Sequence, residues 1–410
     1  MQRDFIFGAS TSAHQVEGFN TNDWSEWEKV NAKRLATEAP HKFEHLVPDW
    51  QAIKSEATNP DNYISGSAVD HWHRFSEDVL VMRDLGIKAY RFSIEWSRME
   101  PLKGYWDEEA IDHYAKVIDE LKSNGIEPWV TLWHRTNPLW IKNLGDWSNS
   151  KTVQFYLRFV DVVVSRYGEK VKYWMPLNEP VMSMGGGYLT GEYPPNRKNI
   201  FVAYKVLKNF VSAHNGAYKL IHSKLSEVYV GMPHAAFYLE AYKGKMINKT
   251  TVKLGHYFAN WLILNKVRKY CDFIGVQYYT RGLVDWFRQV PGDGRKTDMG
   301  WEIYPKGLYK FMKLVWERYR LPMVVTENGV TDAKDEYRAW AIEAHLDQVF
   351  RARDEGVDVR GYFYWSLLDN LEWDKGFWPK FGLVSVNRAT MERTVRESAR
   401  KYKEIISQRS

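Results

Sequence analysis

The chain has 410 residues, of which 44% are hydrophobic and 26% are charged, and its formal net charge is +6. This composition is typical of a globular protein with a large core and excludes a disordered chain. The basic residues are dispersed and form no polybasic tract, so binding to nucleic acid is not expected. No apolar stretch has the length of a transmembrane segment.

Short apolar segments alternate with long amphipathic ones along almost the whole chain. Eight segments are predicted as strands, namely Phe5–Ser10, Ala89–Ile94, Ile126–Leu132, Val171–Leu177, Val228–Met232, Phe273–Tyr278, Met323–Thr326 and Val359–Ser366. Eight strands that alternate with helices predict an α/β fold with a parallel sheet, and eight is the number that closes a barrel. We therefore expect one domain over residues 1–410, folded as a single (β/α)8 TIM barrel.

The helical patterns lie between these strands, and several end at a glycine. The predicted helices are Glu77–Leu85, Glu108–Asn124, Val153–Tyr167, Phe201–His222, Gly307–Tyr319, Asp335–Glu355 and Glu392–Ser407. Gly86, Gly125 and Gly168 are predicted to cap the first three helices at their C-termini. The long segment Ala36–Ser67 reads as an irregular loop on the active-site face, and Tyr238–Lys269 as helical with an excursion.

Two glutamates stand at the ends of predicted strands. Glu179 follows the fourth strand and precedes Pro180, and Glu327 follows the seventh strand and precedes Asn328-Gly329. A carboxylate in this position faces the mouth of a barrel, where burial without a role would be costly. Two such carboxylates across one pocket are the minimum equipment for cleaving a glycosidic bond.

Other polar and aromatic side chains follow the predicted strands in the same way. They are Gln15, Glu17, Arg91, Glu95, Trp96, His134, Asn178, Gln277, Tyr278, Tyr279, Trp365, Asp369, Asn370, Glu372 and Trp373. In a barrel we expect them to converge on one pocket. Amides and carboxylates bind hydroxyl groups and indoles stack on sugar rings, so this set is typical of a carbohydrate site.

Other chemistries find less support. His71 and His73 lack the companions of a zinc motif, and the chain contains neither a glycine-rich phosphate loop nor a GxSxG sequence. We therefore expect no metal and no cofactor. No signal-peptide pattern precedes the first strand, so a cytoplasmic location is expected, while peripheral membrane association and a homo-oligomer remain open.

Several blocks in order resemble glycoside hydrolase family 1, the retaining β-glycosidases, and especially its archaeal branch. The blocks are FIFGASTSAHQVEG from Phe5, DHWHRF from Asp70, YRFSIEWSR from Tyr90, NEP from Asn178, TENG from Thr326, YWSLLDNLEW from Tyr364 and KFGL from Lys380. The resemblance runs nearly from end to end. It implies an exo-acting enzyme, chiefly a β-glucosidase, that takes a small-molecule or oligosaccharide β-glycoside as its substrate.

The resemblance also implies a role for each matching residue. Glu327 would be the nucleophile and Glu179 the acid/base, with Arg91 and Tyr279 contacting the nucleophile. The sugar at the non-reducing end would be bound by Gln15, His134, Asn178, Trp365, Glu372, Trp373 and Phe381. In a retaining enzyme the two carboxyl groups are expected to lie roughly 5–5.5 Å apart.

The chain departs from the family pattern at a few of these positions. Arg135 stands where an aromatic residue usually follows the sugar-binding histidine, Gln277 replaces an asparagine, and Pro176 and Leu371 also differ. Arg135 is the most consequential of these, since it places a cation in a wall that is normally apolar. It is expected either to change the choice of sugar or to pair with a nearby carboxylate.

Three alternatives to a β-glucosidase remain. The dominant activity could be that of a β-mannosidase or β-galactosidase. A phospho-β-glycosidase is disfavoured, because Glu372 would repel a phosphate group. A sugar-binding protein without catalytic activity is disfavoured by the presence of both glutamates.

Overall fold

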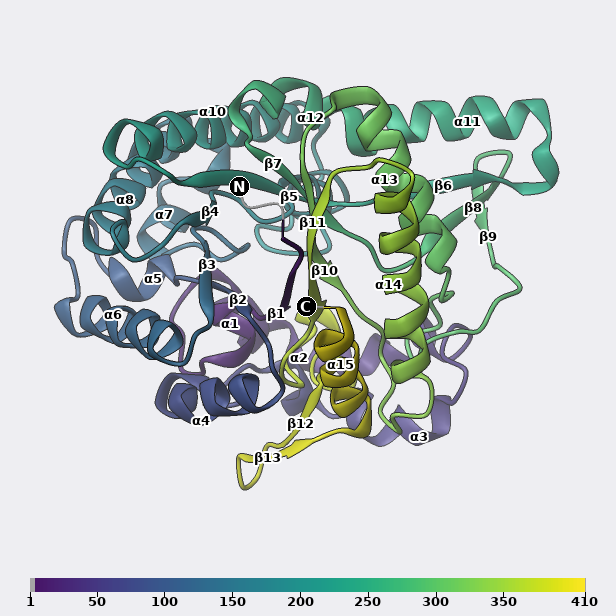
Figure 1. The fold of residues 1–410 in the computed structure, drawn as a ribbon, viewed down its shortest axis with the longest axis horizontal. Helices are drawn as coiled ribbons and strands as arrows, with labels where there is room; N and C mark the ends of the chain where they lie inside the picture. Colours follow the sequence, from purple (N-terminus) through teal and green to yellow (C-terminus); the bar gives the residue numbers. More distant parts are fainter. Residues whose placement is uncertain (1–3, 410) are drawn as a thin grey trace.

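The computed structural model describes residues 4–409, and its centre is a closed barrel of eight parallel strands (Figure 1). The barrel order is β1-β11-β10-β7-β5-β4-β3-β2. Their bounds are β1 Ile6–Ser10, β2 Ala89–Ser93, β3 Glu127–Thr131, β4 Tyr173–Met175, β5 Tyr229–Ala235, β7 Phe273–Gln277, β10 Met323–Asn328 and β11 Val359–Trp365. Each overlaps a predicted strand, and the closed barrel confirms the predicted fold.

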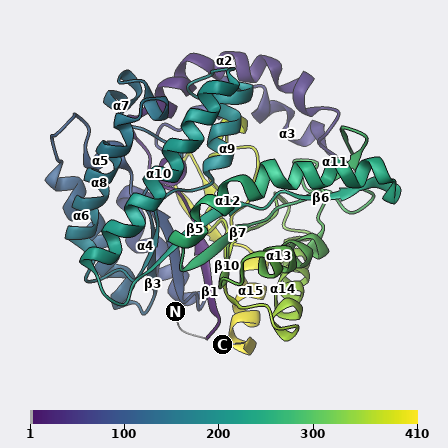
Figure 2. The same cartoon turned by 90° about the horizontal axis from the view of Figure 1, so that it is seen from above.

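Helices surround the barrel on its outer side, as the two perpendicular views show (Figures 1 and 2). The main ones are α4 His71–Asp84, α6 Glu108–Ser123, α8 Lys151–Tyr167, α10 Ile200–Lys224, α12 Leu262–Val267, α13 Pro305–Tyr319, α14 Arg338–Asp354 and α15 Glu397–Arg409. Their apolar faces and the outward-facing strand residues form one large buried cluster. None of the helices between residues 4 and 409 has both the length and the apolar character needed to cross a membrane.

The barrel interior is filled by large aromatic side chains. The indole of Trp129 on β3 stacks on the Tyr173 ring of β4 with a centroid distance of 4.0 Å, and it packs against Phe273 and Phe363. Gly8 on β1 makes room for them, since a Cβ there would lie 2.4 Å from the Phe363 ring. The barrel is therefore closed at its centre, and open space is confined to the ends of the strands.

The segment Ala36–Ser67 was predicted to be an irregular loop, and this prediction was wrong because most of the segment is helical. Helix α2 (Asp23–Phe43) runs well into this segment and is followed by α3 (Trp50–Ala57) and a 3-10 turn, Pro60–Tyr63. The side chains of Asn22 and Asp49 cap α2 and α3, and such caps offset the prolines that suggest a loop. Ala36 and Tyr63 of the segment pack in one buried cluster with Trp373 and with Leu35, the residue before the segment.

Smaller differences concern the ends of elements. The segment Glu392–Ser407 is not one helix, because β13 (Glu392–Val395) first pairs with β12 (Val384–Asn387) before α15 begins. Gly86 and Gly125 have the positive φ of a left-handed cap, but Gly168 has φ −58° and remains helical. The strand predicted at Val171–Leu177 shortens to β4.

The predicted excursion at Tyr238–Lys269 is present. It contains β6 (Tyr238–Ala241) and α11 (Met246–His256), and β6 joins β8 (Arg281–Asp285) and β9 (Arg288–Val290) in a separate small sheet. Figure 2 shows α11 and β6 extending away from the barrel.

Candidate active site

A pocket of about 650 Å³ lies at the C-terminal ends of the barrel strands. Its walls come from the segments after β3, β4, β5, β7, β10 and β11. The predicted residues that line it are His134, Asn178, Glu179, Gln277, Tyr279, Glu327, Trp365, Glu372, Trp373 and Phe381. Residues from distant parts of the sequence are therefore brought together in one site, as the predicted barrel requires.

Glu179 is presented at a sharp turn after β4. Its backbone is left-handed, with φ +43°, and Pro180 begins the short helix α9 (Pro180–Met184) directly after it. The Glu179 amide donates to the carbonyl of Pro233 on β5 over 3.2 Å. Such a backbone conformation is uncommon for glutamate and persists where the surroundings enforce it, as they do in many active sites.

The Glu179 carboxyl group is almost completely buried. Burial raises its pKa to about 7, the Arg135 guanidinium 2.8 Å away opposes that rise, and the charge of Glu327 adds to it. A carboxylic acid with a pKa near neutrality can both donate and accept a proton under physiological conditions. Glu179 is therefore suited to general acid and base catalysis.

The Glu327 carboxylate at the end of β10 is surrounded by hydrogen-bond donors. Arg91 Nη1 and Gln277 Nε2 donate to Oε1 over 2.5 and 2.6 Å, and the Tyr279 hydroxyl donates to Oε2 over 2.7 Å. Arg91 is fully buried, so this contact with Glu327 is a buried ion pair. Donors and a positive charge favour the ionised carboxylate, which is the form required of a nucleophile.

Asn178 and His134 form a hydrogen-bonded pair beside Glu327. Asn178 Oδ1 accepts from Arg91 and from Gln277, so its Nδ2 faces His134 Nε2, 3.0 Å away, as a donor. Burial and the nearby arginines hold the pKa of His134 well below its usual range. The neutral ring therefore carries its proton on Nδ1, a buried atom that has no hydrogen-bond partner among the described residues.

Aromatic rings form the apolar part of the pocket. The His134 ring stacks between the indoles of Trp365 and Trp373, with centroid distances of 6.1 and 5.9 Å. Phe381 lies beside Tyr279 and belongs to the same buried cluster as Trp365. Among the polar groups, burial raises the pKa of Glu372 to about 7. The pocket thus offers flat faces together with groups that bind hydroxyls.

Gln15 lies next to the pocket wall and is completely buried. Its Nε2 donates to Asn370 Oδ1 over 3.1 Å and to the Leu371 carbonyl over 2.5 Å, while its Oε1 accepts from Ser12. These bonds attach the turn after β1 to the turn after β11. Gln15 therefore supports the position of the segment that carries Glu372 and Trp373.

Some residues expected at the pocket belong to the surrounding structure instead. Glu17 pairs with Arg98, Glu95 accepts from Ser97 and Thr136, and Asp369 pairs with Arg396. Trp96 is packed in the core against Phe159. The prediction that these four line the site was wrong, because a loop residue after a strand can face the barrel wall as easily as the pocket.

Other pocket residues were not predicted. Tyr193, Phe237, Arg281, Asp374 and Lys375 also line the cavity. Asp374 and Lys375 directly follow Trp373 and could have been included on that ground. Tyr193 and Phe237 lie in loops with no distinguishing pattern, so only the folded structure assigns them.

Comparison with known proteins identifies the family of the chain. Residues 1–269 and 263–410 match the model of glycosyl hydrolase family 1. Beta-glucosidase A of Thermotoga maritima is 31% identical, over 98% of this chain and 96% of its own.

Two solved structures show the same fold. A beta-glycosidase from Pyrococcus horikoshii has a TM-score of 0.87 and 36% identity, over 98% of this chain and 93% of its own. A beta-glucosidase from Thermotoga maritima in complex with glucoimidazole has a TM-score of 0.86 and 29% identity, over 100% and 99%. The chain belongs to glycosyl hydrolase family 1.

Proposed function

We propose that the protein is a β-glucosidase that removes the non-reducing-end glucosyl residue of a β-glycoside and retains its anomeric configuration. The observation that carries the proposal is the contrast between two buried carboxyl groups in one pocket. Glu327 accepts hydrogen bonds from Arg91, Gln277 and Tyr279, whereas the pKa of Glu179 is raised to about 7. Two carboxyl groups held in different protonation states are what a retaining glycosidase requires.

In the first step Glu327 attacks the anomeric carbon. The new bond joins a Glu327 oxygen to that carbon, while the bond from the carbon to the glycosidic oxygen breaks. Glu179 transfers its proton to the departing oxygen, and the aglycone leaves as an alcohol. The attack forms a covalent glucosyl–enzyme ester on Glu327.

In the second step water hydrolyses the glucosyl–enzyme ester. Glu327 carries no negative charge once it forms the ester, so one cause of the raised Glu179 pKa is removed. Glu179, now ionised, takes a proton from water, and the water oxygen bonds to the anomeric carbon as the bond to Glu327 breaks. Glucose leaves with its original β configuration, and both carboxyl groups return to their starting states.

The remaining pocket residues are proposed to bind the sugar. Hydroxyl groups would be contacted by His134, Asn178, Glu372 and Trp373. Gln15 would hold the segment that carries Glu372 or contact a hydroxyl itself. Trp365 and Phe381 would face the apolar surface of the ring. We further propose that residues 1–410 act as one catalytic domain, since β1 and β11, from the two ends of the chain, are paired.

The test is the hydrolysis of nitrophenyl β-glycosides by the wild type and by Glu327→Ala. We expect Glu327→Ala to lose turnover and to regain part of it with formate or azide, because a small anion can occupy the space of the missing carboxylate. The exposed Glu343 on α14 supplies the control, since Glu343→Ala should keep wild-type rates. Near wild-type activity of Glu327→Ala without added anion would refute the assignment.

A panel of sugars tests the choice of substrate. The proposal expects the highest kcat/KM with the β-glucoside among β-glucoside, β-galactoside and β-mannoside. A higher value for either of the other two would replace glucose as the preferred sugar but leave the mechanism intact. Preference for a 6-phospho-β-glucoside would contradict the role given to Glu372.

A further inference from the structure

The turn that carries Arg135 is anchored on both sides. Arg135 itself has a left-handed backbone, with φ +72°. Next to it, the Thr136 hydroxyl donates to Glu95, and the amide and side chain of Asn137 both donate to Asp23 over 2.7 Å. Such anchoring is what allows a non-glycine residue to stay in this region.

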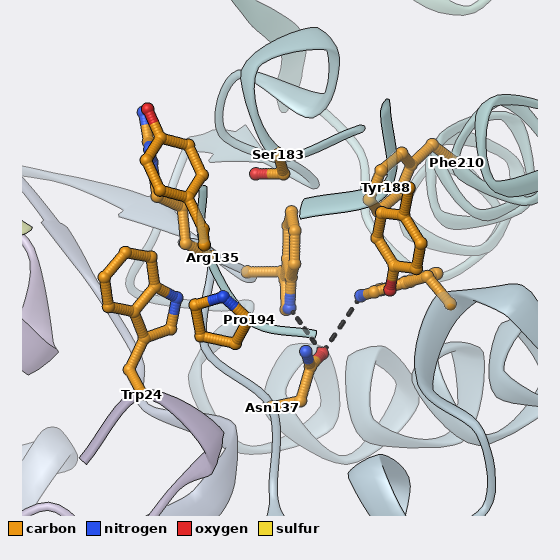
Figure 3. A pocket seen from close by; sticks show the side chains of 10 residues that line it. Trp24, Arg135, Asn137, Ser183, Tyr188, Pro194 and Phe210 are labelled. Carbon is orange, nitrogen blue, oxygen red and sulfur yellow. Dashed lines mark hydrogen bonds between the residues drawn. The ribbon is translucent and has the colours of Figure 1, made fainter. Parts of the chain in front are cut away.

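Arg135 and Asn137 also line a small cavity (Figure 3). Asn137 Oδ1 accepts from the indole nitrogens of Trp133 and Trp147, both over 3.0 Å, which are the two dashed lines in the figure. The two residues after Arg135 are therefore held by four side chains outside the turn, namely Glu95, Asp23, Trp133 and Trp147.

The Arg135 side chain contacts Glu179, the proposed acid/base. It is only 9% exposed, and its Nη2 donates to Oε2 of Glu179 over 2.8 Å. The guanidinium also lies over the rings of Trp373 and Tyr193, 5.1 and 5.7 Å from their centroids. These aromatic faces stabilise a buried cation and fix its direction.

We propose that Arg135 is a positioning residue for the acid/base: it occupies Oε2 of Glu179, so that the proton given to the substrate is carried on Oε1. The inference rests on the proposed function of Glu179. An arginine remains protonated in proteins and has no acceptor atom. The oxygen that faces it must accept, and the neutral acid is therefore favoured with its hydroxyl on the other oxygen.

The fixed charge of Arg135 has a second effect, on the pH at which Glu179 loses its proton. The charged and titratable groups that line the pocket with Glu179, or act on it from behind the wall, come from several elements. They are Arg91 on β2, His134 and Arg135 after β3, Glu192 and Tyr193 after α9, Tyr238 on β6, Tyr279 after β7, Arg281 on β8, Glu327 on β10, and Glu372, Asp374 and Lys375 after β11. Arg135 is the cation in direct contact and favours the ionised form. Its removal should therefore extend the protonated state of Glu179 to higher pH.

The first experiment measures kcat/KM against pH for the wild type, Arg135→Met and Arg135→Lys. The alkaline limb of this profile reports the acid of the free enzyme. Loss of a contacting opposite charge should move the limb of Arg135→Met upward by roughly 1–3 pH units. Arg135→Lys keeps the charge and should remain closer to the wild type. Arginine, methionine and lysine all carry an unbranched Cβ, so the left-handed backbone at this position should cost each of them about the same.

The control is Arg158→Met on α8, which removes an arginine paired with Glu100 outside the pocket. The alkaline limb of the kcat/KM profile of Arg158→Met should stay at the wild-type pH. An unmoved limb in Arg135→Met, or an equal shift in Arg158→Met, would overturn the proposal. If Arg135→Met does not fold, Arg135→Gln carries the same test and the same expected direction.

The second experiment uses azide and does not depend on pH. In Glu179→Ala the Arg135 cation remains at the pocket wall, and azide can bind beside it. Azide then attacks the anomeric carbon of the glucosyl ester, a carbon–nitrogen bond forms, and the bond to Glu327 breaks, which gives β-glucosyl azide. In Glu179→Ala/Arg135→Met the azide concentration for half-maximal rescue should rise about tenfold or more, since an ion contact worth at least ~1.4 kcal/mol is lost. An unchanged concentration would overturn the proposal.

The two proposals can fail separately. If Glu179 is the acid, Glu179→Ala should lose the alkaline limb, because the group that titrates there has been removed. A dinitrophenyl glucoside serves as the substrate, because its leaving group needs no proton and the variant therefore stays active enough to measure. A limb that persists in Glu179→Ala would refute the role of Glu179. A limb that vanishes in Glu179→Ala but stays unmoved in Arg135→Met would refute only the role of Arg135.

Discussion

Gln277 Nε2 lies 2.6 Å from Oε1 of Glu327, and the same nitrogen lies 2.8 Å from the Asn178 side-chain oxygen. Arg91 donates to the same two acceptors. The nucleophile and the amide beside it are therefore held together by two parallel bridges. A glutamine can span this distance from β7, whereas an asparagine in the same place is one methylene shorter.

Gln277→Asn should reduce kcat/KM about 10- to 100-fold. The shorter side chain cannot keep both bonds, and a hydrogen bond to a charged group contributes about 1.5–3 kcal/mol. Steady-state kinetics on a nitrophenyl β-glucoside measures the change, with Gln277→Leu as the variant that removes both bonds. Wild-type kinetics in Gln277→Asn would show that the bridge is not needed.

Tyr279→Phe should lower kcat about tenfold or more. The change removes the only hydrogen bond that Oε2 of Glu327 receives from the described part of the chain. Burial and the nearby glutamates raise the pKa of Tyr279 well above its usual range, so its hydroxyl remains a donor at neutral pH. Pre-steady-state kinetics would show which of the two chemical steps slows. Equal rates for both proteins in both steps would contradict the role given to this tyrosine.

Glu372→Gln should weaken the pH dependence of stability. The pKa of Glu372 is about 7 in the folded protein and near the ordinary glutamate value when unfolded. Between these values the folded state binds more protons than the unfolded state, so the free energy of unfolding falls as the pH rises. The difference amounts to about 1 kcal/mol per pH unit at most. Urea unfolding at pH 5, 6 and 7 should give a smaller fall for Glu372→Gln than for the wild type; an identical fall would contradict the prediction.

Trp129→Ala should destabilise the barrel by about 3–5 kcal/mol, because it removes a fully buried indole and leaves a cavity at the centre of the barrel. Denaturant unfolding measures this loss. Trp340→Ala provides the matched control, since that indole on α14 is 46% exposed, and it should change stability much less. Similar losses for the two variants would argue against a packed barrel centre.

The position of a residue at the end of a strand predicted some of the active-site residues correctly and others wrongly. Glu179, Glu327, Asn178 and His134 lie where the order of strands predicts, because the C-terminal ends of parallel strands open on one face. Glu95 and Asp369 occupy similar places in the sequence but turn toward Thr136 and Arg396. The direction of a loop side chain depends on packing against distant segments, which no local pattern records.

Local sequence signals also failed to predict the structure of the segment Ala36–Ser67. Its prolines suggest a loop, yet Asn22 caps α2, and the segment is helical as far as Phe43. The apolar residues that hold it there, such as Leu35, face Tyr63 and Trp373. Tertiary packing thus outweighs a local preference that is worth only a few kcal/mol.

Hydrophobic periodicity and motif order, which are properties of the sequence alone, determined the eightfold barrel, the family resemblance and the positions of Glu179 and Glu327. The sequence marked Arg135 as unusual but left its role between the choice of sugar and a carboxylate partner. Only the tertiary structure decided that this partner is Glu179, and that Gln277 spans Glu327 and Asn178. The physical reason is that hydrogen bonds and ion pairs form only when two atoms lie about 3 Å apart to within a few tenths of an ångström. For residues far apart in the chain, packing sets that distance.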